Sequence, residues 1–225
     1  MSTLHPSQAK AELRQLLTTD LVLTTAQLER WGLLRAATWL ELPTVTMTCR
    51  TRVTQSKSDT DLTFVALEAE HLDQAPRELM HLCGLAEARR GRVLAAGEEW
   101  RHVRLAGRSK GHQPDAEVVQ LLDGTRRSDC AVEFDAGYST KRISQKLEAA
   151  TNAGYSRILW ATSIHRRAET VMDQATRLHR QGRLVDLRLV ETQFVDFWSP
   201  HDLYTNRPRC YKPMRLTQAF SAAAK

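Results

Sequence analysis

Three acidic residues and two lysines in the second half of the chain have a spacing that suits phosphodiester chemistry. Asp115 follows a proline, Glu133 and Asp135 come after seventeen intervening residues, and Lys141 and Lys146 lie just beyond. The acidic residues lie in segments typical of β-strands, and two neighbouring strands can place Asp115 beside Glu133. Hard cations such as Mg²⁺ prefer carboxylate oxygens and can activate water and stabilise a pentavalent phosphate. We therefore expect a site for Mg²⁺ or Mn²⁺ that hydrolyses phosphodiesters.

The order of these groups resembles that of the PD-(D/E)xK nucleases. In that superfamily an acid follows a proline on one strand, a second acid lies on the next strand, and a lysine polarises the nucleophile. The lysine is expected two residues after the second acid, where this chain has Asp135. The resemblance implies that Lys146, or alternatively Lys141, serves from the following helix. Asp135 is then either a further ligand or a structural acid.

The same resemblance implies a more N-terminal acid. We assign Glu87 to this place because it lies on a predicted helix ahead of the sheet, and Glu98 and Glu99 are alternatives. The expected catalytic residues are thus Asp115, Glu133, Asp135 and Lys146, and the expected metal ligands are Asp115, Glu133 and Glu87.

A structural interpretation of the same residues needs no metal. Asp115 could form the turn at a strand start, and Lys146 could be a surface residue of a helix. Alternation along residues 131–136 would then place Val132 and Phe134 inward and the two acids on the solvated face of an edge strand. Against this, acids that share one strand face close to Asp115 repel one another unless a cation compensates.

The elements around these residues predict an α/β (α+β) fold. Strands are indicated at residues 114–122, 130–135, 157–163 and 184–191, and amphipathic helices at about 139–154 and 165–182. A hairpin followed by strand, helix and strand predicts a mixed sheet with at least one parallel crossover. The resemblance to PD-(D/E)xK nucleases implies that this sheet belongs to a restriction-endonuclease-like domain. Helices are also predicted at 76–90 and 91–100. The tail, residues 201–225, contains prolines and basic residues and is expected to form an irregular arm.

The first 75 residues predict a winged helix-turn-helix. Helices are indicated at 7–19, 24–32 and 33–42, and a β-hairpin follows at 44–67. Thr24 and Gln27 predict a capping box for the second helix, and Gly32 predicts its end. In this arrangement the third helix enters the major groove and the hairpin contacts phosphates. The expected DNA-binding residues are Arg35, Arg50, Arg52 and Lys57, with Arg108 and Lys110 in a basic stretch further on.

An alternative for this segment is a small helix-hairpin packing or protein-interaction module. Residues 1–75 have a net charge of −2, and Trp39 and Leu40 of the third helix are expected in the core, which leaves few side chains for base contacts. The positive charge is concentrated instead in residues 76–112 and 201–225, each with a net charge of +4. We therefore predict three domains: a winged helix at 1–75, a nuclease-like domain at 76–200, and a basic arm at 201–225.

Composition narrows the class of protein. The net charge of +6 and pI near 9.4 suggest a polyanionic partner. The four cysteines form no CxxC pair, so neither a zinc knuckle nor a disulfide framework is indicated. Without a long apolar run or a signal-peptide core, we expect a cytoplasmic location and no membrane partner. The sequence also lacks a nucleotide-binding P-loop, a nucleophile elbow and the paired histidines of a tyrosine relaxase.

Most of the chain, about residues 13–190, resembles the replication-relaxation proteins of plasmids and related mobile elements. The resemblance rests on the segments LLTTDLVLTTAQLERWG, LMHLCGLAEARRG, PDAEVV and VEFDAGYSTKRISQKLEAA. Tyr138 departs from it, because a small residue or threonine is expected there. The resemblance implies binding of double-stranded DNA in plasmid maintenance or mobilisation, as a homodimer or with a partner protein. We expect either a metal-dependent endonuclease or a non-catalytic DNA-binding regulator; a third possibility is an adaptor without DNA affinity.

Overall fold

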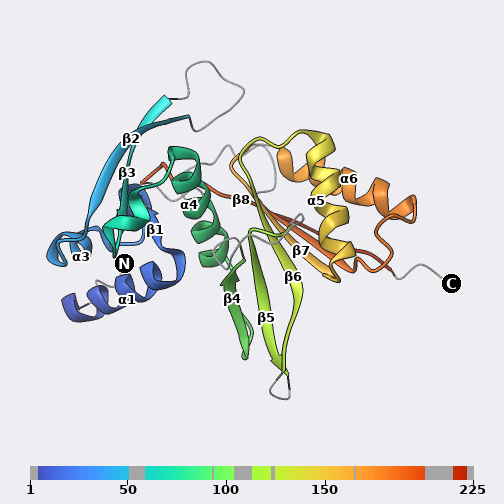
Figure 1. Ribbon diagram of the computed structural model, residues 1–225, viewed down its shortest axis with the longest axis horizontal. Coiled ribbons are helices and arrows are strands. Elements are labelled where there is room, and N and C mark those ends of the chain that lie inside the picture. The colour runs from blue at the N-terminus through green and yellow to red at the C-terminus, as the bar shows by residue number, and fades with distance from the viewer. Residues whose placement is uncertain are drawn as a thin grey trace. The chain divides into compact units, whose positions relative to one another are not determined.

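The computed structural model describes residues 5–50, 59–92, 94–103, 113–122, 125–164, 166–200 and 215–221 (Figure 1). Contacts divide the chain into two units. Unit 1 comprises Met1–Glu87 and Asp196–Arg209, and unit 2 comprises Ala88–Val195 and Cys210–Lys225. Neither unit is therefore one continuous stretch of chain. No helix in the described residues combines the length and apolar character that crossing a membrane requires.

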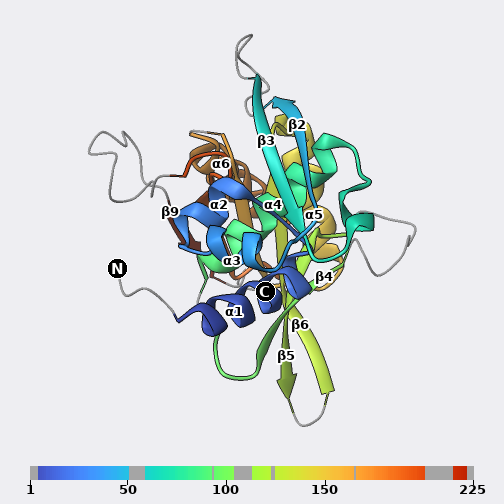
Figure 2. The same ribbon diagram turned by 90° about the vertical axis from the view of Figure 1, so that its left-hand side faces the viewer.

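Unit 1 opens with helices and short strands in the order α1 (Pro6–Asp20), β1 (Val22–Thr24), α2 (Thr25–Arg30), α3 (Leu34–Trp39), β2 (Thr44–Arg50) and β3 (Asp59–Ala66). The strands form an antiparallel sheet in the order β1-β3-β2, and Figure 2 shows β2 and β3 as a long pair. A 3-10 turn, η1 (Ala69–Leu72), and the helix α4 (Pro76–Arg90) follow. The order of helices and hairpin agrees with the sequence-based expectation.

The local signals in this unit behave as expected from their chemistry. Thr24 caps α2: its hydroxyl accepts the Gln27 N–H at 3.1 Å, and the Gln27 side chain accepts the Thr24 N–H at 2.8 Å. Gly32 ends the turn after α2 at a φ of 73°, in the left-handed region that favours glycine. Helices α1, α2 and α3 pack on the sheet through a buried apolar cluster that includes Leu13, Leu28 and Val65. Trp39, which the sequence placed in the core, is 40% exposed.

Unit 2 is built on a six-stranded mixed sheet. Its elements are β4 (Glu98–His102), β5 (Ala116–Leu122), β6 (Thr125–Asp135), α5 (Thr140–Asn152), β7 (Arg157–Thr162), α6 (Arg167–Arg180), β8 (Leu189–Phe194) and β9 (Arg215–Ala219). The strand order follows the chain from β4 to β9. The pairs β6–β7 and β7–β8 are parallel and the other pairs are antiparallel, which confirms the predicted mixed sheet with a parallel crossover.

Helices α5 and α6 lie side by side on one face of this sheet (Figure 1). Their apolar sides pack on alternate residues of the parallel strands, which point to the same face. The cluster includes Ala131, Ile143, Trp160, Val171 and Val190, all of them buried. We refer to this side of the sheet as the helix face and to the other side as the opposite face.

Three features differ from the expectations. Residues 91–100 were expected to be helical, but Glu98–His102 is a strand that pairs with β5, after a turn that contains Gly97 at a φ of 81°. The expected irregular arm at 201–225 contains β9, which pairs with β8. The contact boundaries also differ from the predicted domains 1–75, 76–200 and 201–225, because the first division falls within α4, after Glu87, and Asp196–Arg209 returns to unit 1.

Candidate active site

Two carboxylates and one ammonium group meet at the helix face of unit 2. Asp115 directly precedes β5, and its N–H donates to the carbonyl of Val132 at 3.0 Å, so its side chain lies beside Glu133 of β6. From α5, Lys146 places its Nζ 2.8 Å from Glu133 Oε2 and 3.9 Å from Asp115 Oδ1. Asp115, Glu133 and Lys146 are 6%, 1% and 5% exposed, respectively. The structure thus brings together three of the four expected catalytic residues.

Backbone groups hold this acid-lysine cluster (Asp115, Glu133 and Lys146) in place. The N–H of Phe134 donates to Asp115 Oδ2 at 2.9 Å, and Lys146 Nζ donates to the carbonyl of Gln113 at 3.0 Å. The lysine therefore contacts both the strand of Glu133 and the segment that leads to Asp115. Lys141, the alternative lysine, is exposed on α5.

The two carboxylates of the cluster repel one another. Burial raises the pKa of the Glu133 carboxyl well above its usual range, and the negative charge of Asp115 raises it further, whereas Lys146 opposes both effects. Among the described residues, Glu133 Oε2 accepts no hydrogen bond of good geometry, although the Lys146 ammonium lies close to it. A proton on Glu133 or a second cation would reduce the repulsion between the two carboxylates.

Glu117, a neighbouring carboxylate on the same face, differs from Glu133 in its hydrogen-bond partners. Glu117 of β5 is 3% exposed, but it accepts hydrogen bonds from the Tyr155 hydroxyl at 2.7 Å and from Arg101 Nε at 2.6 Å. Burial alone would raise the pKa of Glu117, yet these hydrogen bonds outweigh it and the pKa is lowered. The pKa of the buried Glu117 is thus lowered by its partners, whereas that of the buried Glu133 is raised in spite of Lys146.

Asp135 has a different set of partners. Its Oδ1 accepts the N–H groups of Gly137 at 2.7 Å and Tyr138 at 2.6 Å, and its Oδ2 lies 3.4 Å from Arg167 Nε. Burial raises the pKa of the Asp135 carboxyl, while the two backbone donors and the Arg167 charge lower it. These contacts fix the turn between β6 and α5. The sequence allows two roles for Asp135, a metal ligand or a structural acid, and these contacts favour the structural role.

Tyr138 follows this turn and packs beside the cluster. Its ring meets that of Trp160 edge-on at 6.2 Å, and the Arg142 guanidinium lies 6.0 Å from the ring centroid. Arg142 precedes Lys146 by one helical turn, so both cations lie on the same side of α5. Burial and the carboxylates of the neighbouring strands raise the pKa of the Tyr138 phenol, which keeps the hydroxyl protonated.

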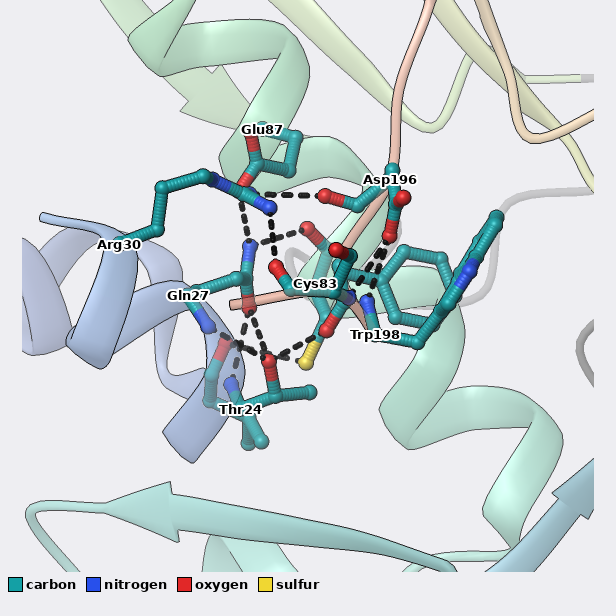
Figure 3. Close-up of polar contacts among 10 residues, drawn as sticks. Thr24, Gln27, Arg30, Cys83, Glu87, Asp196 and Trp198 are labelled. Carbon is teal, nitrogen blue, oxygen red and sulfur yellow. Dashed lines mark hydrogen bonds and ion pairs between the residues drawn. The ribbon is translucent and has the colours of Figure 1, made fainter. Parts of the chain in front are cut away.

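Glu87, expected as the more N-terminal acid, is engaged in a polar cluster of unit 1 (Figure 3). Its Oε1 forms an ion pair with Arg30 and accepts a hydrogen bond from Gln27 Nε2 at 3.0 Å. Arg30 also donates to the carbonyls of Asp196 and Ser199, each at 2.7 Å. Burial raises the pKa of Glu87 to about 7, although Arg30 lowers it. Its contacts therefore assign Glu87 to the packing of α2, α4 and residues 196–199.

The two alternatives to Glu87 do not reach the cluster either. Glu98 pairs with Gln120 and Glu99 with Val119, whereas the Asp115 end of β5 pairs with His102. Both acids therefore lie at the other end of β5, where Glu98 contacts Arg157 at 3.5 Å.

The edge-strand interpretation of the acids is wrong. The strand that carries Glu133 and Asp135, β6, is an interior strand with β5 and β7 on its two sides. Both acids are buried, and Lys146 is buried as well rather than lying on the helix surface. The period-two pattern correctly predicts that Val132 and Phe134 are buried, and they lie on the opposite face. It wrongly leaves the two acids in solvent, because α5 and α6 cover the helix face.

The expected DNA-binding residues are described only in part. Arg35 lies over the ring of Trp39 with its Cζ 5.1 Å from the centroid. Arg50 forms an exposed ion pair with Asp59 across the β2–β3 pair at 3.3 Å. Four further residues lie outside the described ranges: Arg52, Lys57, Arg108 and Lys110.

The acid-lysine cluster has suitable donors for a small hard cation. In the described part of the chain no group of three or more His, Cys, Asp and Glu side chains is arranged to hold a metal ion. Mg²⁺, however, is commonly held by one or two carboxylates and keeps several waters. Asp115 and Glu133 provide two hard oxygen donors side by side, a donor set that fits Mg²⁺ or Mn²⁺.

Comparisons of the chain with protein-family models, with curated proteins and with solved structures find no match.

Proposed function

We propose that this chain binds double-stranded DNA and hydrolyses its phosphodiester bonds with a divalent cation. The observation that carries the proposal is the buried meeting of Asp115, Glu133 and Lys146, in which two carboxylates compete for one ammonium. A purely structural pair is more stable when its charges balance, as they do around Glu117. Two neighbouring carboxylates are the donors that a site for a small hard cation requires.

Each residue of the cluster has a distinct role in this proposal. Asp115 and Glu133 hold the cation, Mg²⁺ or Mn²⁺, which when bound supplies a Lewis acid for the phosphate and lowers the pKa of a bound water. Lys146 orients Glu133 through its 2.8 Å contact and offers positive charge to the phosphate. Asp135 and Arg167 keep the turn before α5 in place, so that Lys146 stays in reach of both acids.

The order of elements supports the DNA-binding part. Unit 1 has the helix and strand order of the expected winged helix, with α3 in the place of the groove-binding helix and β2–β3 as the wing. In unit 2, Asp115 and Glu133 lie on neighbouring strands and the lysine comes from the next helix, as the resemblance to PD-(D/E)xK nucleases implies. We infer a role in a plasmid or mobile element, with a homodimer or a replication or mobilisation protein as the expected partner.

A second candidate is a non-catalytic DNA-binding regulator that keeps the cluster for stability. The deep burial of Asp115 and Glu133 and the direct contact with Lys146 favour it, because a proton on Glu133 would also balance the charges.

The deciding experiment is cleavage of a supercoiled plasmid with Mg²⁺ or Mn²⁺. Wild type is compared with Glu133→Gln and Asp115→Asn, which remove one negative charge each, and with Glu117→Gln as the matched control. We expect metal-dependent nicking by wild type and by the control, and its loss in the two cluster variants. DNA binding is measured in parallel by gel shift.

Two results would count against catalysis. If wild type binds DNA but does not nick it with either metal, the regulator is the better description. If Glu133→Gln and Glu117→Gln nick as well as wild type, cleavage does not come from the cluster. A chain that shows no salt-dependent DNA affinity would contradict both candidates and favour the adaptor.

A further inference from the structure

A polar cavity lies on the opposite face of the unit 2 sheet. It has a volume of about 250 Å³ and is lined by residues of β7, β8, β9 and the turn after α4, among them Gly91, Arg92, Glu191, Gln193, Arg215 and Thr217. Glu191 is paired with Thr217 and Gln193 with Arg215 across β8 and β9, so these side chains share one face. The volume exceeds that of a single water several-fold.

This cavity is separate from the acid-lysine cluster. Glu133 pairs with Trp160, which points to the helix face and packs under α5 and α6. Leu159, the preceding residue, lines the cavity and pairs with Glu191, so the two sites are on opposite sides of the same sheet. An inference about the cavity therefore does not depend on the proposed nuclease activity.

Gly91 closely approaches two side chains of the cavity. A Cβ at this position would lie 2.1 Å from Gln193 Nε2 and 3.0 Å from an Arg215 terminal nitrogen. A larger residue here would shift the ends of these two flexible side chains. The glycine thus lets the backbone approach closely while Gln193 and Arg215 keep their places along the cavity wall.

The cavity wall is rich in hydrogen-bond donors. Arg92 and Arg215 contribute two guanidinium groups, and Gln193 and Thr217 add an amide and a hydroxyl. Arg92 forms an ion pair with Glu191 at 3.0 Å through one terminal nitrogen, but its buried Nε–H has no acceptor among the described residues. This Nε–H is shielded from solvent, so the cavity presents the terminal guanidinium nitrogens rather than Nε to a ligand.

We propose that this cavity binds a small phosphate monoester carried on a hydroxylated group, such as a sugar phosphate or nucleoside monophosphate. The guanidinium groups bind the phosphate oxygens, since planar guanidinium groups form bidentate bonds with phosphate. The volume exceeds that of the phosphate group alone. Glu191 and Thr217 then face the carrier, where a carboxylate accepts hydrogen bonds from ligand hydroxyls.

The test is calorimetric titration of the full chain at fixed salt with ribose 5-phosphate, adenosine 5′-monophosphate, inorganic phosphate and ribose. Two variants alter the site: Arg215→Gln removes an exposed cation, and Thr217→Val removes a hydroxyl without changing shape. Arg183→Gln is the matched control, because Arg183 is an exposed arginine of unit 2 that pairs with Glu148 away from the cavity. Circular dichroism melting establishes that each variant folds.

We expect saturable binding of at least one phosphate ester by wild type and the control, and none of ribose. Arg215→Gln should weaken it about tenfold, as loss of a charge-assisted contact does. A preference for adenosine 5′-monophosphate would indicate a nucleotide, and equal binding of both esters would indicate the sugar phosphate. The proposal is overturned if neither ester binds saturably, if inorganic phosphate binds as tightly as the esters, or if Arg215→Gln and Arg183→Gln bind alike.

Discussion

Replacing Lys146 by methionine tests the electrostatic contribution of the ammonium to the acid-lysine cluster directly. The ammonium lies 2.8 Å from Glu133 and 3.9 Å from Asp115. At an effective dielectric constant of about 20, these distances correspond to gross attractions of roughly 6 and 4 kcal/mol. Removing the ammonium also removes the cost of burying it. We therefore expect the free energy of unfolding to fall by about 3 to 5 kcal/mol, as is usual when one partner of a buried ion pair is lost.

The loss should depend on pH in a defined direction. The pKa of Glu133 is raised in the folded protein, so the stability that its protonated form contributes is present at low pH and lost as the pH rises. Without Lys146 the folded pKa rises further. Lys146→Met should accordingly cost less at low pH than at high pH, where an unfolded glutamate is ionised.

Urea denaturation of wild type and Lys146→Met near pH 5 and pH 8, followed by circular dichroism, measures this effect. Lys141→Met is the matched control, because Lys141 is an exposed lysine of the same helix and should change stability by less than about 0.5 kcal/mol. If Mg²⁺ binds the cluster, it should restore part of the lost stability at the higher pH. A loss that is equal at both pH values, or no larger than that of the control, would refute the charge argument.

Three further predictions concern other contacts. Glu87, with a pKa raised to about 7, should make wild-type stability fall as the pH rises from about 4.5 to about 7, and Glu87→Gln should flatten this dependence in pH-resolved denaturation. Thr24→Ala removes a cap and a hydrogen bond to the Phe197 carbonyl, so it should cost about 2 kcal/mol in thermal unfolding; the exposed Thr18→Ala should cost less, and equal losses would contradict the assignment. If the proposed DNA binding involves Arg142, Arg142→Gln should lower the slope of log affinity against log salt by about 1, whereas an unchanged slope would exclude a phosphate contact.

Local signals in the sequence predicted much of the fold. Thr24, Gln27 and Gly32 define α2 through contacts within a few residues, and the structure has these contacts. The strand at 98–102 was not predicted because its sequence, EEWRH, contains no β-branched residue and follows two alanines, so only its pairing with β5 makes it a strand. The strand β9 likewise depends on a partner far away in the chain.

The part of the candidate site that depends on the pairing of two neighbouring strands could be predicted from the sequence. The spacing of Asp115 and Glu133 placed them side by side once a hairpin was assumed. The choice between Lys146 and Lys141 was open, because it depends on which side of α5 packs on the sheet. The contacts of Glu87 were not predictable, since Arg30 and Asp196 lie far from it in sequence.

Because residues 196–199 belong to unit 1, the contacts of unit 1 cannot be completed until most of the chain has been synthesised. Arg30 and Thr24 form hydrogen bonds with this segment, yet residues 88–195 must leave the ribosome first. At bacterial and eukaryotic translation speeds this takes roughly 5 to 20 s. During that interval the nascent α2 lacks the acceptors that Arg30 and Thr24 use in the finished chain. Expression of unit 1 as residues 1–87 alone should therefore give a product that is prone to aggregate, and a fragment design needs a linker to residues 196–209.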